Sequence, residues 1–230
     1  MKKILIIVVA FFFSNSGLAQ EKYLSISGGY TIPLGDFSSS DINSKQSGFA
    51  NNGYNFSFEM TFFFSDFVGL GANLRFNNVS FNSQLFNDLL VEKFQGQLES
   101  ISLTSGNYNL HNFLIGPYIK FDAGDYFSLY GKAFLGVMTT FRPNQSLNYK
   151  LPLENSQSIE TVGKYSGSFA YNLGAGAFVK FNRKLGLRLS ADYIAGNPRY
   201  EDFDFDNLEV IEKKQAVAYM NYNAGLMLTF

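Results

Sequence analysis

Alternation of apolar and polar residues with a period of two is the feature that most constrains this chain, because it favours extended strands with one apolar and one polar face. The segment AYMNYNAGLMLTF, residues 218–230, places Tyr222, Leu226 and Phe230 on one face and Asn221 and Asn223 on the other. The pattern recurs in eight segments: 23–34, 54–64, 68–76, 111–121, 127–141, 169–181, 185–193 and 218–230. The sequence therefore predicts an all-β fold of eight strands.

The connections between these segments alternate in length. Short connections cover 65–67, 122–126 and 182–184, and long ones cover roughly 35–52, 77–108, 142–167 and 195–215. All short turns then lie at one end of the strands and all long loops at the other. This arrangement predicts an eight-stranded antiparallel up-and-down β-barrel, and in transmembrane barrels the short turns are periplasmic and the four long loops extracellular.

The two faces of the segments indicate which solvent each one meets. The apolar faces are uniform and rich in aromatic residues, and about 9–11 residues of alternation suffice to cross a bilayer at the usual tilt. The opposite faces carry charged residues, which are costly inside a narrow barrel unless they are paired. We therefore expect lipid outside and a polar network in the lumen, formed by Glu59, Arg75, Lys120, Lys132, Lys180, Arg188 and Asp192.

The N-terminus has the features of a secretory signal peptide. Lys2 and Lys3 precede an apolar run from Ile4 to Phe13, and the small residues Gly17 and Ala19 suit cleavage after Ala19. We expect residues 1–19 to be removed and 20–230 to form one barrel domain. The chain has no cysteine and a net charge of −1, so it offers no disulfide and no reason to expect a nucleic-acid partner.

The segments FLIGPYIKF, NLGAGAFVKFNRKLGLRLSADY and NYNAGLMLTF carry a resemblance to a known family. With the signal peptide and the loop pattern, the chain resembles the small outer-membrane β-barrels of the OmpA/OmpX type, including the porin-like outer-membrane β-barrel family common in Bacteroidetes. The resemblance implies a monomer in a Gram-negative outer membrane, in contact with lipid and lipopolysaccharide. It also implies that the barrel assembly machinery reads the C-terminal strand through Phe230, Leu228, Leu226 and Tyr222.

Candidate chemistry is sparse, and we expect no catalytic, cofactor or metal site. His111 is the single histidine, and the serine that follows two residues later in lipid A deacylases is replaced by Phe113. The stretch EDFDFDNLE offers Asp202, Asp204 and Asp206 as a weak cation-binding loop, but Asn207 and Lys213 replace the glycine and glutamate of an EF-hand. Without these residues the stretch is a solvated hairpin tip.

Several functions follow from a barrel of this kind. A lumen of eight strands is filled by its own side chains, so we expect a plugged barrel with a structural or interaction role and an unknown extracellular ligand bound through the loops. A narrow porin-like channel and a lipid A-modifying enzyme are the alternatives. A soluble lipocalin-like barrel is the alternative fold. Aromatic loop residues would either adhere to a partner or pack the outer hairpins: Phe81, Phe86, Phe94 and Tyr149.

Overall fold

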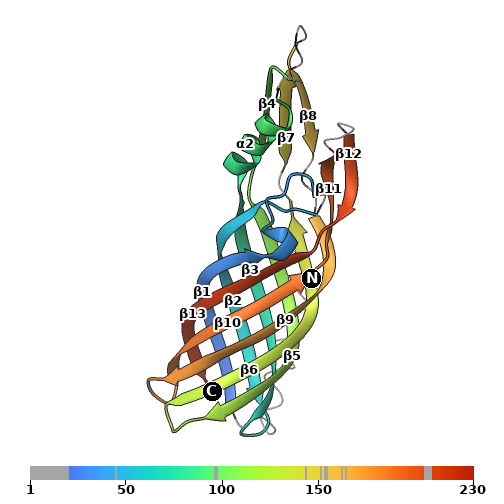
Figure 1. Cartoon of the computed structure of the whole chain (residues 1–230). Helices are drawn as coiled ribbons and strands as arrows, with labels where there is room; N and C mark the ends of the chain where they lie inside the picture. The colour runs from blue at the N-terminus through green and yellow to red at the C-terminus, as the bar shows by residue number, and fades with distance from the viewer. Residues whose placement is uncertain are drawn as a thin grey trace.

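The computed structural model describes residues 21–44, 46–95, 98–142, 144–150, 152, 155–161, 163, 165–204 and 209–230. These residues form a closed antiparallel β-barrel with the strand order β1-β13-β10-β9-β6-β5-β3-β2 (Figure 1). The prediction of an eight-stranded antiparallel barrel is confirmed. The signal-peptide prediction concerns residues 1–19, which lie outside the described part of the chain.

Six of the eight barrel strands are longer than the alternation predicted, and β6 and β13 have the predicted length. They are β1 (Glu21–Leu34), β2 (Ala50–Phe63), β3 (Val68–Phe81), β5 (Tyr108–Asp122), β6 (Phe127–Phe141), β9 (Tyr165–Lys180), β10 (Leu185–Gly196) and β13 (Val217–Thr229). Pairing continues where the outward face has become polar, as at Asn78 and Asn109, whose side-chain amides bond at 2.8 Å. The apolar outward positions end there, although the backbone ladder persists.

The short turns and both described chain ends share one end of the barrel. The turns cover 64–67, 123–126 and 181–184, and Gly124 allows the second turn its φ of 92°. Lys22 and Phe230 exchange backbone hydrogen bonds of 3.3 and 3.0 Å where β1 meets β13. The first and last strands therefore close the barrel at this end, which is the lower end in Figure 1.

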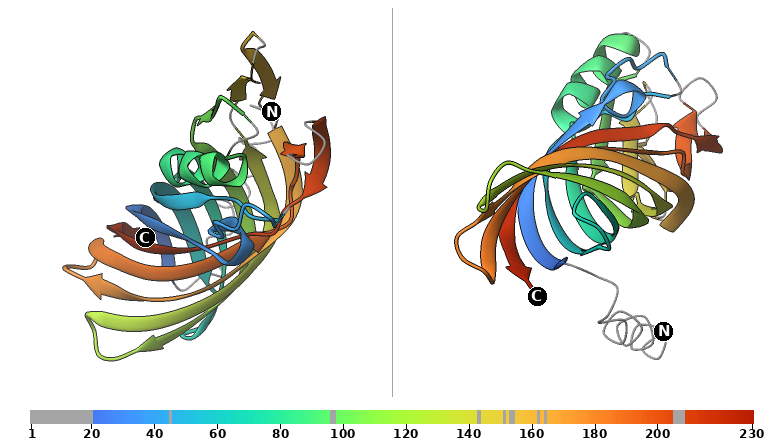
Figure 2. Two further views of the ribbon diagram at one scale, coloured as in Figure 1. Left: turned by 45° about the horizontal axis from the view of Figure 1, so that its top comes forward. Right: turned by 90° about the horizontal axis from the view of Figure 1, so that it is seen from below.

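The long connections at the other end are not bare loops, which corrects the predicted loop boundaries. They contain η1 (Gly35–Phe37), α2 (Ser83–Lys93), β4 (Ser100–Ser105), β7 (Gln145–Lys150), β8 (Gln157–Thr161), β11 (Arg199–Asp204) and β12 (Glu209–Lys214). Strands β4, β7 and β8 form a sheet and β11 pairs with β12. We call α2, β4, β7 and β8 the cap, which stands above the barrel (Figures 1 and 2).

The cap has a small apolar core of its own. Phe86 and Leu90 of α2 are buried with Ile101 and Leu103 of β4 and with Tyr149 of β7. Phe81 and Phe94 pack against this cluster. The four aromatic loop residues singled out from the sequence therefore serve packing, the second of the two roles expected for them.

An apolar band covers the outer wall of the barrel. Leu70, Ile115, Leu135, Leu173 and Leu226 each leave more than half of their surface exposed. The apolar residues of the alternating segments therefore face outward, as predicted. Monomeric soluble proteins rarely expose apolar patches larger than a few hundred Å². Within the described residues, no helix has both the length and the apolar character needed to cross a membrane.

Candidate functional site: the filled lumen

Five charged side chains meet at the middle of the lumen, and we call them the central cluster: Glu59, Arg75, Lys132, Arg188 and Asp192. Each lies at an inward position of its strand, on β2, β3, β6 or β10. No member is more than 6% exposed. The sequence analysis identified all five. The fold brings them together although Glu59 and Asp192 are 133 residues apart in the sequence.

Glu59 is the lower anion of the central cluster. Its carboxylate lies 2.8 Å from Lys132 Nζ and 2.5 Å from an Arg188 Nη2. Asn73 donates a hydrogen bond of 2.9 Å and the Tyr118 hydroxyl donates another. These partners therefore hold the Glu59 carboxylate in a network of charge-assisted hydrogen bonds.

Asp192 is the upper anion, and it is fully buried. Its oxygens lie 2.8 Å from Arg75 Nη2 and 2.9 Å from Lys132 Nζ. Ser190 and Asn223 donate to it at 2.9 and 3.2 Å. Lys132 therefore bridges both carboxylates and joins the five charges into one network.

A glycine provides the space that this network occupies. A Cβ added at Gly174 would lie 2.7 Å from Lys132 Cε and would also collide with an Asp192 carboxylate oxygen. Gly174 pairs with both residues, being opposite Lys132 on β6 and opposite Asp192 on β10. The absence of a side chain at Gly174 thus leaves room for Lys132 and Asp192 to approach each other.

Lys120 and Lys180 do not belong to the central cluster, although the sequence placed them in the same polar network. They converge at the lower mouth on Glu21, at 2.5 and 2.7 Å. Tyr23 also donates to Glu21, and Asp122 lies 3.3 Å from Lys120. Sequence reasoning missed Glu21 because it precedes the first alternating segment, although its spacing of two residues from Tyr23 and four from Ser25 places it on the inward face.

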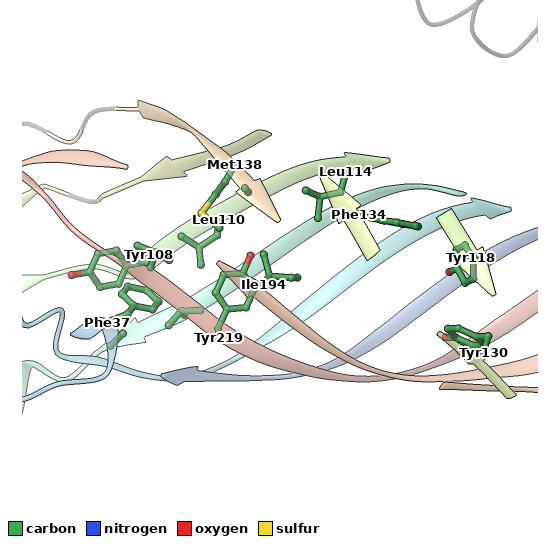
Figure 3. Packing of buried hydrophobic residues seen from close by; sticks show 14 of the residues in the cluster. Phe37, Tyr108, Leu110, Leu114, Tyr118, Tyr130, Phe134, Met138, Ile194 and Tyr219 are labelled. Carbon is green, nitrogen blue, oxygen red and sulfur yellow. The ribbon is translucent and has the colours of Figure 1, made fainter. Parts of the chain in front are cut away.

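The upper lumen is apolar, which corrects the expectation of a charged and amide-rich interior throughout. Leu110, Met138 and Ile194 are completely buried there, and Figure 3 shows how they lie between the strands. Below them, the Tyr219 hydroxyl accepts from Asn112 at 2.7 Å. The signal was present in the sequence, because the inward positions of β5, β6 and β10 change from charged to apolar toward the long loops.

The residues assigned to the assembly signal lie on the outer wall. Tyr222, Leu226, Leu228 and Phe230 are 42–69% exposed on β13, which pairs with β1 at the barrel closure.

The acidic hairpin is only partly described. Asp202 and Asp204 belong to β11 and pair with Ile211 and Glu209 of β12. Asp206 lies outside the described residues. For Asp202 and Asp204 the structure describes the backbone but not the side chains. Across the part of the chain that the structure describes, no three potential metal ligands come together.

His111 lies on the outward face of β5 and not in a polar site. Its ring packs edge-on against Phe76 at 5.2 Å, and Phe113 follows it on the same face. This environment lacks the serine that a deacylase would need at position 113.

Comparisons with known proteins bear on the fold. No protein-family model matches the sequence, and no curated protein matches it. The crystal structure of the outer membrane protein OprG from Pseudomonas aeruginosa is similar over 93% of this chain and 98% of that one, with 16% identity and a TM-score of 0.50. Ail, the attachment invasion locus protein of Yersinia pestis, covers 92% and 100% with 17% identity and a TM-score of 0.43.

Neisserial surface protein A is a further structural neighbour, at 12% identity and a TM-score of 0.48 over 91% of this chain and 97% of that one. At these identities the likeness to OprG concerns the fold alone. The chain therefore has the barrel architecture found in small outer-membrane proteins.

Proposed function

We propose that this chain is an integral protein of a Gram-negative outer membrane, with a structural or interaction role, a plugged lumen and a surface-exposed cap. One observation carries the proposal: the closed barrel has an apolar outer wall, while the middle of its lumen is filled by paired charges. At this level the polarity is the reverse of that of a soluble barrel that binds an apolar ligand.

A membrane supplies the solvent that the outer wall requires. Barrel closure satisfies the backbone hydrogen bonds of every strand, which lipid demands because it offers no donors or acceptors. Phe64, Phe121, Phe181 and Phe230 are exposed near the end with the short turns, where an interfacial aromatic girdle would lie. We place that end in the periplasm, after export through the signal peptide at 1–19.

The central cluster supports a plug and not an open pore. Its five side chains span the lumen from opposite walls and leave no member more than 6% exposed. Aromatic residues lie directly below the cluster, where Tyr130 stacks on Phe178 at 4.3 Å. An ion that crossed the barrel would have to separate these groups.

The cap supports an interaction role. Its sheet turns one face to α2 and the other outward, and the outward face presents small polar side chains: Ser100, Ser102, Thr104, Asn148 and Ser158. Because a folded cap orients these groups more precisely than a loop does, it suits recognition of an extracellular partner.

Two measurements test the proposal. The protein refolded in detergent should migrate differently on a gel before and after heating, and a protein that stays monomeric in buffer without detergent would contradict membrane insertion. On intact cells, a protease should cleave the cap and leave the short turns untouched. Cleavage at the short turns instead would reverse the orientation.

The channel alternative rests on Lys132, whose ammonium group contacts the carboxylates of both Glu59 and Asp192. Lys132 could release one carboxylate while it stays paired with the other, and so open a path for an ion. In planar bilayers we expect no stable single-channel steps from the wild type. Steps that disappear in Arg75→Ala or Lys132→Ala would overturn the plug. For the enzyme alternative, a change in lipid A mass that depends on His111 would overturn the non-enzymatic role.

A further inference from the structure

The outer third of the lumen is an apolar chamber closed from above. Its wall is formed by completely or almost completely buried side chains from four strands: Tyr108, Leu110, Met138, Ile194, Val217 and Tyr219. Figure 3 shows Phe37 beside Tyr108, with Leu110 and Tyr219 next along the lumen. The chamber lies above the central cluster and takes no part in its ion pairs.

The chamber is filled by a residue that does not belong to the wall. Phe37 comes from η1, in the first long connection, and none of its surface is exposed. Its ring packs edge-on against Tyr108 with 5.1 Å between centroids. The wall carries small residues at this level, such as Ala170 and Val79. The strands therefore leave a space that one aromatic ring completes.

The segment that delivers this ring is attached to the barrel by a few hydrogen bonds. We call residues 35–44 and 46–49 the lid. Within it, Gly48 N donates to Asp36 O at 2.8 Å. Tyr108 donates its hydroxyl to Gly48 O at 2.9 Å, and Gln215 donates to Gln46 O at 3.2 Å.

Both ends of the lid have a backbone in the left-handed region. Gly35 has a φ of 58° and Phe49 a φ of 50°. The left-handed region is readily accessible to glycine but unfavourable for phenylalanine. The Phe49 ring is held in the cap by edge-on packing on Phe86 at 4.6 Å. Packing in the cap thus maintains a strained residue at the point where the lid ends.

We propose that the chamber is a binding site for a small uncharged aromatic molecule, and that Phe37 occupies it in place of that ligand until the lid opens. The wall selects against charge, because an ion would lose its hydration there without gaining a partner. Deeper in the lumen, Asn112 Oδ1 is buried and accepts no hydrogen bond, so one hydroxyl on the ligand finds an acceptor there.

The first experiment empties the chamber. Phe37→Ala, refolded in detergent, should bind toluene, and toluene at about ten times its dissociation constant should raise the unfolding temperature by about 3–6 °C. Phe121→Ala removes a ring of the same size from the outer wall, where it leaves no enclosed space, and should show no such rise. The proposal is wrong if folded Phe37→Ala is unaffected by toluene, or if Phe121→Ala responds equally.

The second experiment asks whether a ligand displaces the native ring. The chain has no tryptophan, so Phe37→Trp carries a single fluorescent reporter in the chamber and Phe86→Trp carries one in the cap. Toluene should shift the emission of Phe37→Trp to longer wavelength in a saturable manner and leave Phe86→Trp unchanged. Benzoate, of similar size but charged, should shift neither. A response to benzoate, an equal response in both variants, or no response to toluene would overturn the proposal.

Discussion

Replacing Asp192 by asparagine tests the energetic role of the central cluster most directly. The change keeps the shape of the side chain and removes its charge. In the wild type the carboxylate is fully buried, between Arg75 at 2.8 Å and Lys132 at 2.9 Å. Asp192→Asn leaves three cations facing the single carboxylate of Glu59, at a site that bulk solvent does not reach.

The expected loss follows from the cost of leaving a buried charge unpaired. Breaking a buried ion pair by removing one partner costs about 3–5 kcal/mol. With a urea dependence of about 2 kcal/mol per molar, the unfolding midpoint should fall by roughly 2 M. The folded fraction in detergent can be followed by heat-modifiable gel migration, which needs no tryptophan.

A matched control separates burial from the loss of a carboxylate. Asp122 pairs with Lys120 at 3.3 Å, but its side chain is 43% exposed. Asp122→Asn should therefore cost less than about 1 kcal/mol. A double variant with Lys132→Met restores the net charge of the cluster, and about 0.5–3 kcal/mol of the loss should be recovered. Equal midpoints for Asp192→Asn and Asp122→Asn would refute the reasoning.

Three further outcomes are expected. Gly174→Ala should destabilise the barrel by about 1–3 kcal/mol in the same urea assay, because the added Cβ collides with the central cluster. Gly167→Ala is the control and should be neutral, because a Cβ at Gly167 meets nothing within 4 Å. Asn87→Ala should speed hydrogen exchange and proteolysis in the cap, because the Asn87 amide bonds both backbone groups of Leu103 on the edge of β4, at 2.6 and 3.0 Å; unchanged exchange at Leu103 would contradict this role. Phe230→Ala should reduce the amount assembled in cells but leave the midpoint of the refolded protein within about 0.5 kcal/mol of wild type; equal losses in both assays would make Phe230 a stability residue and not an assembly signal.

The barrel was predictable from the sequence because the outer face of each strand meets the same apolar phase along most of its length. A strand with one wall in an apolar phase needs an apolar residue at every second position, so Leu226 and Leu70 follow the same rule without any knowledge of their neighbours. The inward charges were recognisable for the same reason. Which cation meets which anion was not predictable, because the pairing depends on barrel closure and on the stagger of the strands.

The cap was not predicted, although weaker signals of it exist. Ile101 and Leu103 alternate with serine and threonine in β4, and Leu147 and Tyr149 alternate with Ser146 and Asn148 in β7. These runs are only six residues long, and β4 pairs with β7 across the whole of β5 and β6. A strand as short as β4 depends on its partner for stability, and that partner is distant in sequence. The local pattern of residues therefore does not reveal the strand.

The layers of the lumen also determine whether the charged residues alone block the passage of ions. The central cluster lies between two layers that exclude water: Tyr23, Phe63 and Phe178 below it, and Leu110 and Ile194 above it. Ion pairs are stronger in such a medium than in water, and the apolar layers would remain if one charge were removed. Opening a conducting path therefore requires displacement of Phe37 and the upper layer as well as separation of Lys132 from its two carboxylates. A single charge substitution should weaken the folded barrel without opening it, so stability and conductance respond to different residues.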